Sequence, residues 1–136
     1  MSIILEVLTG QRFVAPKDKA TGTVITQNTF AEVDPATGLV VPADASTTVA
    51  TLAGRFINDI SAADALLVAD VEAPIKNALY LVDTTNNSDT AHDGQLMVLT
   101  DASEVNNTGT TAGAGIVKQE AVFGQPADKK IYVSIV

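Results

Sequence analysis

His92 is the side chain in this sequence best suited to act as a catalytic base near neutral pH, and it is the only histidine. It lies in the polar segment 89–94, which reads DTAHDG. A hydrolase that uses histidine also needs a nucleophile beside it, and the G-x-S-x-G turn that presents such a serine does not occur here. We therefore expect a solvated loop histidine, no catalytic residue and no enzymatic activity.

Two further segments contain residue types that bind ions. Segment 83–89, DTTNNSD, offers hard oxygen ligands at the short spacing that Ca²⁺ favours. Aligned as an EF-hand loop, it has Ser88 in place of the sixth-position glycine and Gly94 in place of the twelfth-position glutamate. Segment 109–115 holds three glycines, as a phosphate-binding loop would, but no Gly-Lys-Ser/Thr follows them. We expect polar turns in both places, with neither metal nor cofactor.

Charge and cysteine content narrow the range of partners. The formal net charge of −8 and the isoelectric point of about 4.3 disfavour binding to nucleic acid or to an anionic membrane surface. No apolar run approaches the ~20 residues that span a bilayer, and the N-terminal run lacks the basic flank of a signal peptide. The absence of cysteine excludes thiol catalysis, thiolate metal sites and disulfides.

The composition predicts a single β-rich domain. A chain of 136 residues with 46% hydrophobic residues is long enough to bury a core without staples. Only 4% of residues are aromatic and none is Trp, so that core must consist of Val, Ile, Leu and Ala. The clearest local signal is the DPATG turn at 34–38, which joins apolar segments 30–33 and 39–41 into a hairpin.

Apolar segments of strand length recur along the rest of the chain. Gly54, inside one of them, predicts a bulge or a close backbone approach. Segment 61–71 is ambiguous, because Ser61 and Asp64 resemble a helix capping box, but we favour a strand from about Ala65. Segments 83–93 and 101–115 are expected to be long polar loops. The expected strands are 3–8, 23–29, 30–33, 39–41, 48–57, 65–71, 77–82, 95–100, 116–123 and 131–136.

The N-terminal apolar run is the strongest candidate for a partner contact, and two interpretations are open. The run is either a strand buried in the domain or an extended arm that pairs with the edge of a partner's sheet. We accordingly divide the chain into an arm or strand at 1–15 and a single β domain at 16–136. The candidate interface residues are Ile3, Ile4, Leu5, Glu6, Val7, Leu8, Phe13 and Val14.

In the order of its segments, the chain resembles the lambda D-like head-decoration (cement) proteins of tailed bacteriophages. The hairpin through 34–41 leading to 53–56, the turn 61–64 with the strand 65–71, and the C-terminal VSIV at 133–136 carry the likeness. The chain departs from that family in its polar insertions at 83–93 and 101–115, its apolar N-terminus and its lack of Trp. These departures leave the oligomeric state and the contact surface open.

The resemblance implies an all-β fold, as a small barrel, a β-tulip-like domain or a sandwich, with an N-terminal arm. It also implies a protein made in the bacterial host cytoplasm that sits on the outer surface of a virion capsid, usually as a homotrimer. There it would clamp neighbouring major capsid proteins and stabilise the shell. The alternatives are another self-assembling virion component, such as a tail-tube or fibre domain, and a carbohydrate-binding β-sandwich that would need Tyr80 or Tyr132.

Overall fold

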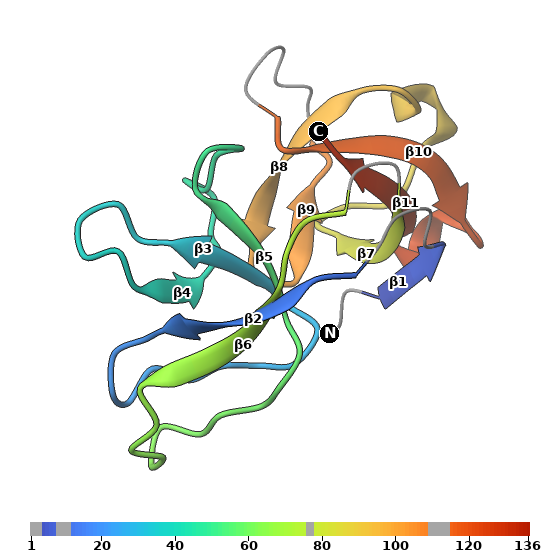
Figure 1. The fold of residues 1–136 in the computed structure, drawn as a ribbon. Helices are drawn as coiled ribbons and strands as arrows, with labels where there is room; N and C mark the ends of the chain where they lie inside the picture. Colours follow the sequence, from blue (N-terminus) through green and yellow to red (C-terminus); the bar gives the residue numbers. More distant parts are fainter. Residues whose placement is uncertain (1–3, 8–11, 76–77, 109–114) are drawn as a thin grey trace.

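The computed structural model describes residues 4–7, 12–75, 78–108 and 115–136, and these residues form two β-sheets connected by turns and two short 3₁₀ helices (Figure 1). The predicted all-β class is therefore confirmed. In chain order the elements are β1 (Ile4–Val7), β2 (Val14–Asp18), β3 (Phe30–Val33), β4 (Val40–Pro42), β5 (Leu52–Phe56), β6 (Val68–Glu72), β7 (Leu79–Thr84), η1 (Thr90–His92), β8 (Leu96–Asp101), β9 (Glu104–Asn106), β10 (Val117–Phe123), η2 (Pro126–Asp128) and β11 (Lys130–Ile135).

The first sheet closes into a five-stranded barrel. The strand order of this sheet is β1-β7-β11-β10-β8-β9. A parallel pairing of β7 with β9 closes the five strands from β7 to β9 into the barrel, and β1 lies outside the ring. β1 pairs antiparallel with the first half of β7 and forms the outer end of this sheet. Alternating apolar residues point into the barrel, as their burial shows, and include Tyr80, Val82, Met97, Leu99, Val105, Ile131 and Val133.

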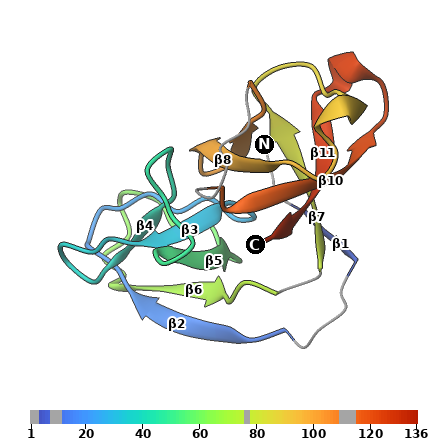
Figure 2. The ribbon, with the colours of Figure 1, turned by 90° about the horizontal axis from the view of Figure 1, so that it is seen from above.

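The second sheet, in the order β2-β6-β5-β3-β4, lies beside the barrel (Figure 2). Phe30 and Ala43 belong to the barrel's core cluster, so one face of this sheet packs on the barrel. Val40, Phe56 and other residues of the opposite face form a second core cluster. Both faces of the central strands are therefore buried.

The β3–β4 hairpin confirms the predicted turn. The Asp34 carboxylate accepts a hydrogen bond from the Ala36 amide at 2.9 Å, and the Gly38 amide donates to the Asp34 carbonyl at 2.7 Å. Gly38 has φ of 73°, the left-handed conformation that glycine adopts without steric cost. The five residues of this turn thus set the register Val33↔Val40 on their own.

Gly54 confirms the predicted bulge and close approach. The pairing of β3 with β5 shifts register between Ala31 and Glu32. Gly54 has φ of 136°, and a Cβ placed on it would lie 1.9 Å from the backbone oxygen of Glu72 on β6. The absence of a side chain at this position allows β5 and β6 to approach each other beside the barrel.

Several segments differ from the sequence-based expectation. Segment 23–29 contributes only an isolated bridge, Ile25↔Ile60, which covers the second core. Ser61 and Asp64 form a turn in which the Asp64 carboxylate accepts from the Ser61 amide at 3.1 Å, and β6 begins only at Val68. Segment 101–108, expected to be loop, contains β9, whose single apolar residue Val105 is fully buried.

The N-terminal segment is incorporated into the protein's own sheets where the structure describes it. β1 is a strand of the first sheet, which is the first of the two interpretations of the apolar run. The expected boundary between residues 15 and 16 lies inside β2, a strand that pairs with β6 along its whole length. The arm and the domain therefore share a strand and are continuous.

Candidate interaction surface

His92 is the last residue of η1, a 3₁₀ turn that the Asp89 side chain caps by accepting from the Ala91 amide at 2.8 Å. Its Nδ1 is buried and has no hydrogen-bond partner among the described residues. Gln119 of β10 connects this turn to the barrel, because its fully buried side-chain amide donates to the Asp89 carbonyl and to an Asp93 carboxylate oxygen, at 2.8 Å each. His92 is therefore part of a turn that hydrogen bonds connect to β10.

Several oxygen atoms of segment 83–89 accept hydrogen bonds from other parts of the protein. Asp83 is buried and accepts from Lys130 at 2.7 Å. Asn107 donates to the carbonyl oxygens of Asn86 and Asn87 at 3.1 and 3.0 Å. Among residues 4–7, 12–75, 78–108 and 115–136, no group of three or more His, Asp or Glu side chains is placed to hold a metal ion. Most of the glycine-rich segment 109–115 lies outside the described residues.

The predicted interface residues divide into three groups. Ile3 and Leu8 lie outside the described residues. Ile4, Leu5, Glu6 and Val7 make up β1, in the register Ile4↔Leu81, Leu5↔Tyr80 and Val7↔Leu79. Phe13 and Val14 are solvent-exposed at 66% and 43%, beside the start of β2.

Exposed apolar side chains concentrate on β2, β6 and the residues next to them, which we call the β2–β6 ribbon (12–18 and 66–72). Of the nine large hydrophobic residues that are exposed in the described part of the chain, five belong to it: Phe13, Val14, Leu66, Leu67 and Val68. In the antiparallel register Val14 lies opposite Glu72 and Asp18 opposite Val68, so the two apolar groups occupy the two ends of the ribbon. Large exposed apolar surfaces in a folded protein mark sites of interaction.

Sequence reasoning missed Leu66, Leu67 and Val68 as surface residues. Their apolar run, ALLV, is typical of a buried strand, and the expectation placed a strand from Ala65. The structure exposes the run because β6 starts at Val68, and its neighbour β2 ends opposite that residue at Asp18. The carboxylates of Asp64 and Asp70 on either side of the run are the only sequence signal of exposure.

Prolines protect both edges of the second sheet. The Lys19 amide donates to the Leu67 carbonyl and the Ala73 amide to the Phe13 carbonyl, at 2.8 and 2.9 Å. Because pairing groups alternate along an antiparallel strand, the backbone of Pro16 faces the outer edge of β2. At the opposite edge, the Ala43 amide donates to the Phe30 carbonyl at 3.0 Å. The backbone of the preceding residue, Pro42 of β4, therefore faces outward.

Proline lacks the donor that an added strand would need. A partner is therefore expected to contact the side chains of the β2–β6 ribbon rather than extend this sheet.

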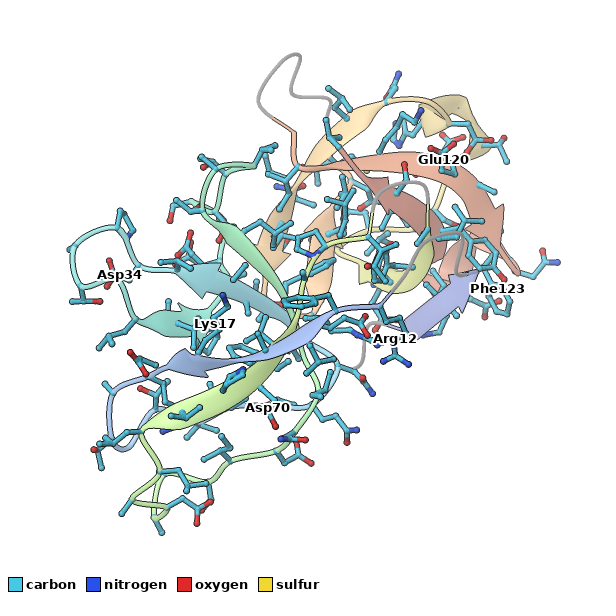
Figure 3. The ribbon with its side chains drawn as sticks, in the orientation of Figure 1. Arg12, Lys17, Asp34, Asp70, Glu120 and Phe123 are labelled. Carbon is cyan, nitrogen blue, oxygen red and sulfur yellow. The ribbon has the colours of Figure 1, made fainter. Side chains whose placement is uncertain are left out.

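A buried charge cluster fixes the ribbon to the rest of the sheet. Glu72 is fully buried and accepts from Arg55 Nη2 at 3.1 Å and, through its other oxygen, from Nε of Arg12 (labelled in Figure 3). Nearby, the Ile75 amide donates to the Tyr80 hydroxyl at 3.3 Å, and burial raises the pKa of that hydroxyl. These two ion pairs connect the segment before β2 to β6 and β5 to β6, so removing Glu72 would leave Arg55 buried without its counter-charge.

The two tyrosines bear on the carbohydrate alternative. Tyr80 is 1% exposed and belongs to the barrel core, so it is not available to stack on a sugar. Tyr132 packs edge-on against Phe123, with ring centroids 5.7 Å apart and an interplanar angle of 83°. Of the two tyrosines, Tyr132 is therefore the one that a sugar could contact, at the pair that it forms with Phe123.

Across the described part of the chain, no helix has the length and apolar character needed to cross a membrane. Compared with models of protein families, with curated proteins and with solved structures, the chain has no significant match.

Proposed function

We propose that this protein is a structural virion component that binds the outer surface of an icosahedral phage capsid and clamps neighbouring major capsid proteins. The observation that carries the proposal is the concentration of exposed apolar side chains on the β2–β6 ribbon, where Arg12 and Arg55 pair with the buried Glu72. Phe13 and Val14, expected at the interface from sequence, belong to this surface.

A rigid surface of modest size suits a protein that acts in many copies. Each exposed side chain of the size of Leu or Phe stabilises a complex by roughly 1.5–3 kcal/mol when it becomes fully buried. Ordering costs at an interface offset much of that gain, so a single copy would bind weakly. Attachment at several subunits of one shell multiplies such weak contacts into stable binding.

The N-terminal segment would contribute in a different way from a free arm. β1 occupies the end of its sheet, and its outer edge has no partner among the described strands. This edge could accept a strand of the capsid protein while β1 remains paired with β7. Deleting residues 1–8 would remove a strand of the protein's own sheet, so side-chain substitutions on the ribbon make a cleaner test than truncation.

The test measures binding to purified expanded capsids of the source phage by co-sedimentation, with light scattering of the free protein. We expect saturable binding at a fixed ratio, and a free mass corresponding to one or a few 14.1 kDa chains. Replacing Phe13 and Val14 with serine should weaken binding at least tenfold. Val49→Ser, at an exposed valine between β4 and β5, is the control for loss of an exposed apolar side chain and should bind normally.

Each other outcome has a definite meaning. Wild-type protein that fails to bind expanded shells would refute the proposal. Equal losses in Val49→Ser and the ribbon variant would refute the assignment of the surface. Self-assembly into rings or tubes without capsid protein would favour the tail-tube or fibre alternative.

A further inference from the structure

We infer that a hollow beside the exposed end of β6 receives an arginine or lysine side chain of the major capsid protein; the identity of that partner rests on the function proposed above. The hollow encloses about 500 Å³. It is lined by Gln27, Ile57, Asn58, Asp59, Ile60, Leu66, Val68 and Asp70. Three of these residues, Leu66, Val68 and Asp70, belong to the β2–β6 ribbon, so the hollow continues the proposed contact surface.

The charge of the hollow is negative and is not compensated within it. Asp59 and Asp70 both line it, and none of the lysine, arginine or histidine residues that the structure describes does. Neither carboxylate takes part in an ion pair among the described residues. The chain as a whole carries a formal net charge of −8, which adds to the attraction for a cation.

Hydrogen bonds hold both carboxylates in place. Asp59 Oδ1 accepts from the Gln27 backbone amide at 2.7 Å, and Asp70 Oδ2 accepts from the Asn58 side-chain amide at 2.9 Å. Each of these bonds uses one carboxylate oxygen. The second oxygen of each group makes no further hydrogen bond among the described residues and is available to an external donor.

The walls of the hollow favour a cation with an aliphatic stem. Leu66 and Val68 are exposed at 55% and 41%, and Ile57 lines the hollow beside them. Arginine and lysine pack a methylene stem on apolar surface while the charged end reaches a polar group. A metal ion fits poorly, because the site offers two carboxylates and no third acidic or histidine ligand.

The first experiment uses the free protein, so that its outcome does not depend on capsids. N-acetyl-arginine amide is titrated into ¹⁵N-labelled protein, and amide shifts are followed by NMR. We expect shifts at Gln27, Asn58, Asp59 and Asp70. N-acetyl-citrulline amide, which has the same shape without the charge, should bind at least fivefold more weakly.

Two matched variants test the same site. Asp70→Asn keeps an acceptor for Asn58 and removes one negative charge, and it should weaken arginine binding at least fivefold. Asp34→Asn makes the same change at the tip of the β3–β4 hairpin, which Figure 3 shows far from Asp70, and it should have no effect. Equal affinity for the arginine and citrulline probes, or equal effects of the two variants, would overturn the inference.

Capsid binding by the same variants completes the test. Asp70→Asn should bind expanded shells at least fivefold more weakly than Asp34→Asn, with the difference shrinking as salt is raised. If wild-type protein binds shells and both variants bind equally, the hollow is not the docking site although the proposed function stands. If wild-type protein takes up the arginine probe and ignores shells, the proposed function fails and with it the capsid protein as the partner.

Discussion

Replacing the buried Gly54 with alanine should destabilise the protein more than the same replacement at a turn glycine. Gly54 has φ of 136°, and the new Cβ would lie 1.9 Å from the Glu72 oxygen and 2.8 Å from the Glu72 carbonyl carbon. Ordinary contacts at such a position are 3.4–4 Å. Both close atoms belong to backbone, so no side chain can rotate away to make room.

Two contributions determine how much free energy of unfolding the Gly54→Ala variant should lose. A non-glycine residue held in a sparsely populated backbone region costs about 1–3 kcal/mol. Moving β6 away from β5 also disturbs the pairing of Arg55 with Glu72 and the buried ion pair that they form, and breaking a buried pair costs about 3–5 kcal/mol. We expect a total loss of at least about 4 kcal/mol, a large part of the ~5–15 kcal/mol stability of an ordinary domain.

The assay is urea unfolding monitored by circular dichroism, and the free energy of unfolding is obtained by linear extrapolation to zero urea. Gly38→Ala is the matched control, because Gly38 also has positive φ, 73°, but nothing lies within 4 Å of its added Cβ. That variant should lose only about 1–2 kcal/mol, the cost of the left-handed conformation. If Gly54→Ala loses no more than Gly38→Ala, the close packing of β5 on β6 is not what stabilises this sheet.

Three further predictions concern the buried charges, the tyrosine and the sheet edges. Glu72→Gln leaves Arg55 buried without its counter-charge and should lower the free energy of unfolding, measured in urea, by about 3–5 kcal/mol. A loss below about 1 kcal/mol would contradict a stabilising role for the Arg55–Glu72 pair. Burial raises the pKa of Tyr80 above its ordinary 10.0, so its contribution to stability is complete below pH 10 and is lost as the pH rises through the higher folded-state pKa. Tyr80→Phe should flatten this alkaline decline in unfolding experiments, and an unchanged slope would assign the decline to another group. Replacing both Pro16 and Pro42 with valine restores an outward donor at each edge of the second sheet, so light scattering should detect association that the wild type does not show at equal concentration.

Local features of the fold could be predicted because a few adjacent residues determine them. The DPATG turn sets its hairpin through bonds between Asp34 and residues two to five positions away. Gly54 was predicted to mark a bulge or close approach, since an interior glycine in a strand has few other roles. The assignment of Phe13 and Val14 as contact residues stays a prediction; the structure shows only that both are exposed.

Other features depend on pairings that the sequence does not signal. Barrel closure needs the parallel pairing of Asp83 with Glu104, and β9 offers only Val105 as an apolar residue. The apolar run at 66–68 looks like a buried strand until the ends of β2 and β6 are known. The hollow likewise depends on bringing Gln27 to Asp59, and Asn58 to Asp70, across a fold that only long-range contacts specify.

The sequence by itself determined the β class, the turns and the glycine at the point of close approach, because turn chemistry and side-chain alternation act over a few residues. The tertiary structure alone decided that β1 pairs within the protein's own sheet, that two arginines neutralise Glu72, and that Leu66 to Val68 face solvent. Burial and ion pairing depend on which strands become neighbours, and that choice is made by the whole core rather than by any single segment.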